Sequence, residues 1–296
     1  MAAHPQIASD FIGLIRRAYL SRRRFMTASA AAAAGYTLAA GPVRANPITT
    51  SSAGLDTGIA KIDTADGVMP AYYAKPAGAH NPPIVLVAME VFGLHEYIKD
   101  VARRLAKLGA FAVAPDYYFR LGDLTKISDT KDLMPLVNSK PDAQLISDLD
   151  AAVRWAKAQG GDAEKLGILG FCRGGRTVWV YSATNPDVKA GVAFYGSLVD
   201  PAGQKGLWPK SPIELASEMK APVLGLYGGD DQGIPPEQVD MMKAALAAAG
   251  KTAEFKIYPG APHGFHADYR PSYHEAAAKD AWIQAENWFK RWKVLP

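Results

Sequence analysis

The sequence is poor in cysteine and lacks the common glycine-rich nucleotide motifs. Cys172 is the only cysteine among 296 residues, which excludes an intrachain disulfide framework and a cysteine-based zinc site. No Gly-x-Gly-x-x-Gly or Gly-x-x-x-x-Gly-Lys-Ser/Thr segment occurs, so we expect no nucleotide cofactor. His263, His266 and His274 lie on a segment interrupted by prolines, without a carboxylate pair to organise them, so we expect no metal ion.

An excess of positive charge is also missing once the first 45 residues are set aside. Those residues carry six arginines and one acid, whereas the rest of the chain carries 27 basic and 28 acidic side chains. A nearly neutral body gives no electrostatic reason to expect a nucleic-acid partner. Hydrophobic residues make up 49% of the chain, and the 27 glycines and 21 prolines show no period. This composition is typical of a globular protein.

The first 45 residues resemble a twin-arginine export signal. The segment 21–27 reads SRRRFMT, an alanine-rich run follows, and small residues occupy positions 43 and 45, where a signal peptidase reads the chain. The run of about 13 residues is shorter than the roughly 20 that a membrane span needs, so we expect no stable anchor. We predict export by the twin-arginine machinery, cleavage near Ala45, and a periplasmic protein with one domain over 46–296. A helix of the folded protein and an uncleaved anchor remain alternatives.

Strand-like and helix-like segments alternate along the rest of the chain. Residues 56–64 and 67–74 fit an antiparallel pair. We expect further strands at 83–89, 111–115, 166–171, 190–195, 223–227 and 253–258, and helices at 95–108, 142–158, from about 173, 236–249 and 275–292. The stretches 121–141 and 196–220 are expected to be long loops. This order predicts an α/β fold, with a mostly parallel sheet covered on both faces and a ligand site at the carboxyl ends of the strands.

The sequence Gly170-Phe171-Cys172-Arg173-Gly174 falls between a predicted strand and a predicted helix. It has the spacing of the nucleophile elbow Gly-x-Ser-x-Gly, with cysteine in place of serine. A turn this tight needs small residues two positions before and after the nucleophile. The sulfur would then project at a helix N-terminus, where backbone amides favour a thiolate and a developing oxyanion.

An acid and a histidine follow in the order that α/β-hydrolases use. Asp231 comes after the strand at 223–227, and His263 comes after the strand at 253–258. We expect His263 to accept the thiol proton and return it later, and Asp231 to orient the imidazole ring. Asp230 is the alternative acid.

Five segments together resemble the dienelactone hydrolase (carboxymethylenebutenolidase) family. They read VAMEVFGL at 87–94, APDYYFR at 114–120, GFCRGG at 170–175, GGDDQGIP at 228–235 and HGF at 263–265, and the likeness runs over about 55–293. The resemblance implies an α/β-hydrolase fold with a Cys-Asp-His triad that opens enol lactones to carboxylate products. It also implies a small-molecule lactone or ester as the substrate.

The resemblance carries further roles onto residues of this chain. Cys172 would be the nucleophile, His263 the base and Asp231 the orienting acid, while Glu90 would contact the resting thiol and help to activate it. The backbone amides of Val91 and Arg173 would be the oxyanion donors. Three residues are expected to bind the substrate. Arg120 matches the position where the family binds the substrate carboxylate, Arg270 would be its second arginine, and Tyr118 would line the pocket. Arg270 departs from the family pattern, because the second arginine of well-known members lies four residues after the histidine, where this chain has Ala267.

Two other functions remain open at this stage. A broader carboxylesterase could use the same triad on neutral esters. A non-catalytic periplasmic protein could use the same pocket to hold a carboxylate ligand without turnover.

Overall fold

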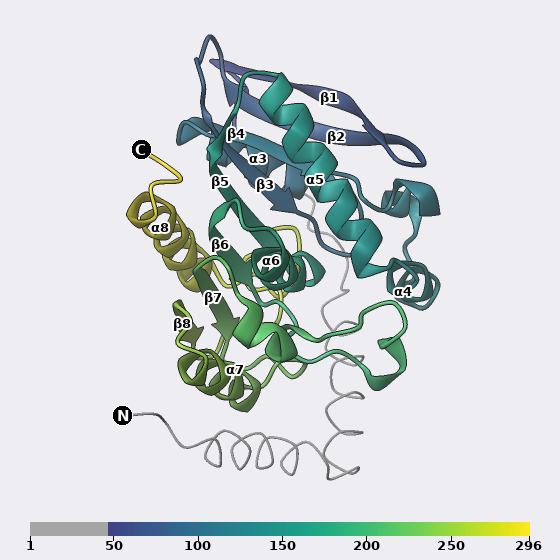
Figure 1. The fold of residues 1–296 in the computed structure, drawn as a ribbon, viewed down its shortest axis with the longest axis vertical. Coiled ribbons are helices and arrows are strands. Elements are labelled where there is room, and N and C mark those ends of the chain that lie inside the picture. Colours follow the sequence, from purple (N-terminus) through teal and green to yellow (C-terminus); the bar gives the residue numbers. More distant parts are fainter. Residues whose placement is uncertain (1–46) are drawn as a thin grey trace.

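The computed structural model describes residues 47–296, so the expected export signal and its cleavage site lie outside the described residues. The described part contains an eight-stranded sheet in the order β1-β2-β4-β3-β5-β6-β7-β8 (Figure 1). Its strands are β1 (Leu55–Thr64), β2 (Gly67–Pro76), β3 (Pro83–Ala88), β4 (Phe111–Pro115), β5 (Asp162–Phe171), β6 (Val188–Phe194), β7 (Val223–Gly228) and β8 (Ala253–Tyr258). The pairs β1–β2 and β2–β4 are antiparallel, and all other neighbours are parallel. The predicted, mostly parallel α/β sheet is confirmed.

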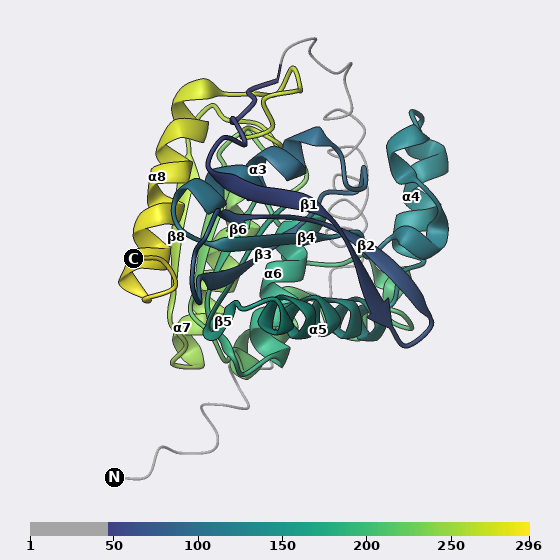
Figure 2. The same ribbon diagram turned by 90° about the horizontal axis from the view of Figure 1, so that it is seen from above.

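Helices cover both faces of the sheet (Figure 2). The helices α3 (Glu96–Lys107) and α8 (Glu275–Arg291) pack on one face, and α5 (Asp142–Ala158), α6 (Arg173–Thr184) and α7 (Pro236–Ala248) pack on the other. The central strands are buried because both faces are covered; in β3, for example, the five residues 84–88 are 0% exposed. Within residues 47–296, no helix has both the length and the apolar character to cross a bilayer.

The two stretches predicted to be loops contain short helices. The helix α4 (Thr130–Asn138) lies inside 121–141, which was expected to be irregular. Asp129 caps it by accepting a hydrogen bond from the amide of Lys131 at 2.8 Å, and Leu133 and Val137 bury one face. Pro135 inside the helix obscured this pattern in the sequence.

The second of these stretches, 196–220, includes two 3₁₀ helices, Ala202–Gln204 and Pro212–Glu218. A capping box between Ser211 and Glu214 begins the longer one. Two more 3₁₀ turns, Phe119–Leu121 and Leu124–Lys126, follow β4. Strand β5 begins at Asp162, four residues earlier than predicted. The apolar pattern did not reveal this start, because three of these four residues are charged and none of the four is fully buried.

Candidate active site

Cys172 occupies a strained turn between β5 and α6. Its backbone has φ 55° and ψ −113°, which is costly for a residue with a Cβ, and its amide donates to the carbonyl of Phe194 at 3.0 Å. A Cβ at Gly170 would lie 2.3 Å from the carbonyl oxygen of Gly174, and one at Gly174 would lie 2.0 Å from that of Ala88. The two glycines of the motif are therefore required by close backbone packing, as expected for a nucleophile elbow.

His263 and Asp231 meet at the ends of β8 and β7. The His263 Nδ1 atom is 2.7 Å from Asp231 Oδ2. The other carboxylate oxygen, Asp231 Oδ1, accepts the amides of Gly233 at 2.8 Å and Ile234 at 3.1 Å. Both oxygens are held, so the carboxylate can fix the orientation and tautomer of the ring. Asp230, the alternative acid, is exposed, and the structure pairs His263 with Asp231 instead.

The electrostatic surroundings of His263 favour its protonated form. Burial lowers the pKa of His263, but the Asp231 carboxylate and the neighbouring Cys172 raise it, and the net result is a pKa of about 10. Interaction with Cys172 contributes to that rise, which places the imidazole within reach of the sulfur. A histidine that carries a proton beside a sulfur atom can exchange that proton with the sulfur or pass it to a leaving group.

Glu90 follows β3 and is completely buried. Its Oε2 atom accepts the hydroxyl of Tyr269 at 2.5 Å and lies 3.4 Å from Nε2 of His95. Burial raises the pKa of Glu90, but the charge of Arg270 and the contacts with His95 and Tyr269 lower it to about 2, so the carboxylate is ionised. Within the described residues Oε1 has no hydrogen-bond partner. The contact between Glu90 and the thiol remains a prediction.

Two backbone amides near the elbow are the predicted oxyanion donors: Val91, in the loop after β3, and Arg173, the first residue of α6. Gly174 lies against the carbonyls of Ala88 and Met89, which brings the start of α6 to the end of β3. Within residues 47–296, neither the amide of Val91 nor that of Arg173 donates to a backbone carbonyl of a turn, loop or cap. Their predicted role as oxyanion donors is compatible with this arrangement and remains a prediction.

Arg120, predicted to bind a substrate carboxylate, lies between two aspartates of the protein itself. It donates to Asp148 through Nη1 at 2.8 Å and Nη2 at 3.0 Å, and to Asp66 through Nε at 2.9 Å. Lys140 binds the same Asp148 carboxylate. Substrate binding by Arg120 therefore stays a prediction, and it would require the guanidinium to leave or share these acids.

Arg270 lies in the buried group around Glu90. It is 3% exposed, and its guanidinium stacks on the rings of Phe92, at 4.2 Å, and Tyr269, at 5.2 Å. Tyr118 is also buried, 4.9 Å from the ring of Tyr117, and burial raises its pKa. The structure thus places Arg270 much closer to the reacting groups than the sequence alone could establish.

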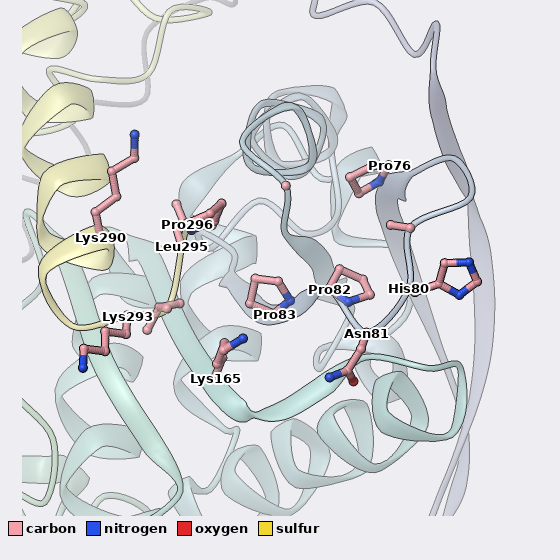
Figure 3. Close-up of a pocket in the computed structure, with 13 residues that line it drawn as sticks. Pro76, His80, Asn81, Pro82, Pro83, Lys165, Lys290, Lys293, Leu295 and Pro296 are labelled. Carbon is pink, nitrogen blue, oxygen red and sulfur yellow. The ribbon is translucent and has the colours of Figure 1, made fainter.

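A groove elsewhere on the surface is separate from these residues. It has a volume of about 640 Å³ and is lined by prolines and by Lys165, Lys290 and Lys293 (Figure 3). Pro83, the first residue of β3, is part of this lining, whereas Glu90 follows the last residue of that strand. A strand rises about 3.3 Å per residue, so the groove lies at the opposite end of the sheet. In the part of the chain that the structure describes, no group of three or more potential ligands is arranged to hold a metal ion.

Comparison with known proteins identifies the family to which this chain belongs. The model of the dienelactone hydrolase family matches residues 69–293. The chain belongs to the dienelactone hydrolase family. A carboxymethylenebutenolidase-type protein of Methylorubrum extorquens is 51% identical over 289 residues, which cover 97% of this chain and 98% of that protein. A carboxymethylenebutenolidase-type protein of Escherichia coli is 46% identical over 261 residues, which cover 87% and 95%.

A solved structure agrees with this assignment. The crystal structure of a dienelactone hydrolase-type protein from Klebsiella pneumoniae has a TM-score of 0.78 and 48% identity, covering 80% of this chain and 99% of that one. The predicted α/β-hydrolase fold and family are therefore confirmed. This dienelactone hydrolase family member is a hydrolase that acts on ester or lactone bonds.

Sequence analysis missed the residues that surround the predicted site. Tyr269 and His95 flank Glu90, and Asn138 contacts Arg173. Tyr269 lies 179 residues from Glu90, so no local spacing could have indicated their contact. The only sequence signal for Tyr269 is its position in the chain, directly before Arg270 and six residues after His263.

Proposed function

We propose that this hydrolase opens enol lactones, or cleaves small carboxylate-bearing esters, through a covalent thioester on Cys172. The observation that carries the proposal is the combination of a strained elbow cysteine with a buried His263–Asp231 pair. The family assignment supports the same bond class. The first alternative is a broad carboxylesterase that uses the same residues.

The first half of the reaction forms the thioester. The Cys172 thiol gives its proton to His263, and the thiolate sulfur attacks the carbonyl carbon. The new C–S bond pushes the carbonyl electrons onto oxygen, where the amides of Val91 and Arg173 would donate hydrogen bonds. As the carbonyl re-forms, the bond to the ring or alcohol oxygen breaks. His263 donates its proton to that departing oxygen.

The second half regenerates the enzyme. His263, now neutral, takes a proton from water while the water oxygen attacks the thioester carbon. The C–S bond then breaks, the acid product leaves, and the sulfur takes its proton back from the protonated histidine. Asp231 would stabilise the imidazolium in both halves through the contact at 2.7 Å. Glu90 would assist activation of the thiol at the start of the cycle.

The substrate's charge separates the lead function from its alternative. Arg120, Arg270 and Tyr118 are the proposed substrate-binding residues for a carboxylate-bearing substrate. The occupation of Arg120 by Asp66 and Asp148 favours the alternative, a carboxylesterase that accepts neutral esters. Purified protein should be screened against matched anionic and neutral lactones and p-nitrophenyl esters. Faster hydrolysis of the anionic member of each pair supports the lead, and equal rates support the carboxylesterase.

Cys172→Ala tests the catalytic proposal itself. The variant should bind ligand and keep its fold but lose turnover, because its side chain contributes one sulfur atom to a preformed turn. Tight binding of a carboxylate by the wild type without any turnover would support the non-catalytic alternative. We also propose that this hydrolysis takes place in the periplasm, after export and cleavage near Ala45.

A further inference from the structure

Arg173, the residue directly after the nucleophile, carries a buried positive charge that no acid of residues 47–296 neutralises. Arg173 is 7% exposed. The Nη2 atom donates to Oδ1 of Asn138 at 2.6 Å, and the guanidinium lies 3.9 Å from the ring centre of Trp208. Its Nε–H is buried and has no hydrogen-bond partner in the described part of the chain. The contacts that hold Arg173 are therefore neutral.

Arg176, one helical turn further along α6, is a buried arginine whose charge is compensated by acidic side chains. Its guanidinium donates to Asp142 at 2.7 and 3.0 Å and to Asp200 at 2.7 and 2.6 Å. Burying a charge is costly unless an opposite charge compensates it. Arg176 has two such partners, whereas Arg173, on the same helix and against the same Trp208 ring, has none.

The position of Arg173 increases the free-energy cost of burying its charge. It is the first residue of α6, where the helix dipole contributes partial positive charge and disfavours a cation. Arg173 directly follows the nucleophile, since Cys172 is the N-cap of α6. Burial raises the pKa of Tyr118, the Arg173 charge lowers it and Cys172 raises it, so both groups act on the same phenol. An anion that entered here would be bound next to the nucleophile.

We propose that the Arg173 guanidinium binds the carboxylate of the substrate beside the Cys172 sulfur. The proposal rests on the proposed hydrolysis of carboxylate-bearing lactones or esters, and it gives the carboxylate a site that the protein's own aspartates do not occupy. A guanidinium presents a planar set of N–H groups that match a carboxylate. Asn138, at the end of α4, and Trp208, in the 196–220 stretch, would hold that plane in place.

The first experiment measures kcat/KM on two matched pairs of substrates. One pair is dienelactone and methylenefuranone, which is the same ring without the carboxylate; the other is p-nitrophenyl hydrogen succinate and p-nitrophenyl butyrate. Arg173→Met should lower kcat/KM for the anionic members about ten- to a hundredfold, the loss expected for a hydrogen bond to a charged group. The neutral members should change less than about threefold. Arg173→Lys should restore part of the loss, and Arg291→Met, on the surface of α8, should change neither.

A second variant tests the charge without removing the arginine. Asn138→Asp places a carboxylate where the amide oxygen now accepts from Arg173. The protein should become more heat-stable, because a buried cation gains a partner, yet its kcat/KM for the anionic substrates should fall, because the new carboxylate competes with the substrate. An arginine with a purely structural role predicts higher stability with no such selective loss.

A binding experiment keeps the site testable apart from turnover. Calorimetry should show that Cys172→Ala binds succinate, and that the double variant with Arg173→Met binds it at least tenfold more weakly. Three results would overturn the proposed carboxylate site. The two variants could bind succinate with equal affinity, or Arg173→Met could lower kcat/KM equally for both members of a substrate pair. The third result is that inorganic phosphate binds as tightly as succinate. Absence of hydrolysis of every substrate by the wild type would overturn the proposed function, while the calorimetry would still decide whether Arg173 binds carboxylates.

Discussion

Removal of one buried hydroxyl group, in Tyr269→Phe, should destabilise the protein in a pH-dependent way. That hydroxyl donates to Oε2 of Glu90 at 2.5 Å, and Nε2 of His95 lies 3.4 Å from the same oxygen. The other carboxylate oxygen, Oε1, has no hydrogen-bond partner within residues 47–296. Loss of a hydrogen bond to a buried charge costs about 1.5–3 kcal/mol in the free energy of unfolding. For a protein of this size, the melting temperature should fall by roughly 3–12 °C at pH 7.

The sign of the pH dependence follows from the pKa of Glu90, which lies at about 2 in the folded protein against an ordinary value of 4.5. A depressed carboxyl pKa contributes stability above the unfolded value, and this contribution is lost as the pH falls from 4.5 towards 2. The full contribution is about 3 kcal/mol. Without the Tyr269 hydroxyl, the pKa of Glu90 should rise towards its ordinary value. The destabilisation should therefore be largest above pH 5 and should shrink in acid.

Scanning calorimetry of Tyr269→Phe and wild type at pH 7 and pH 3 measures both effects. Tyr273→Phe is a matched control, because this half-buried phenol lies four residues further along and does not touch Glu90. It should change the melting temperature by no more than 1–2 °C, roughly what 0.5 kcal/mol produces. Equal melting temperatures for Tyr269→Phe and wild type at pH 7, or a deficit that stays constant from pH 7 to pH 3, would refute the assigned role of the hydroxyl.

Three further outcomes are expected. Asp231→Asn should lower the pKa of His263 from about 10 by removing the carboxylate that raises it, and should reduce kcat by about 10³–10⁴-fold; a pH–rate profile and a histidine NMR titration check this. Arg120→Ala should cost about 2 kcal/mol of unfolding free energy by removing a partner of buried Asp148, measured by urea denaturation, while a neutral ester is hydrolysed at the wild-type rate. Replacing Arg22 and Arg23 with lysine should block delivery to the periplasm, which cell fractionation and mass spectrometry of the mature N-terminus would show.

The features that could be predicted from the sequence are those set by local chemistry. The alternation of apolar strands and amphipathic helices gave the α/β sheet because each pattern depends on residues within one element. The elbow was recognisable because its small residues are demanded by backbone atoms within a few positions and by Ala88, at the end of the adjacent strand.

The features that could not be predicted depend on contacts between distant residues. Arg120 was predicted to bind a substrate carboxylate, but Asp148 and Asp66 reach it from 28 and 54 residues away. Tyr269, whose hydroxyl donates to Glu90, is 179 residues distant. Arg173 was singled out only for its backbone amide, because the absence of an acid around its side chain becomes visible only when the chain is folded.

The most direct test of the covalent mechanism is mass spectrometry of the enzyme quenched in acid during turnover. A lactone remains wholly attached after its ring opens, so the protein mass should rise by the mass of one lactone, and peptide mapping should locate the addition on Cys172. An addition on any other residue, or turnover by Cys172→Ala at the wild-type rate, would contradict the proposed thioester.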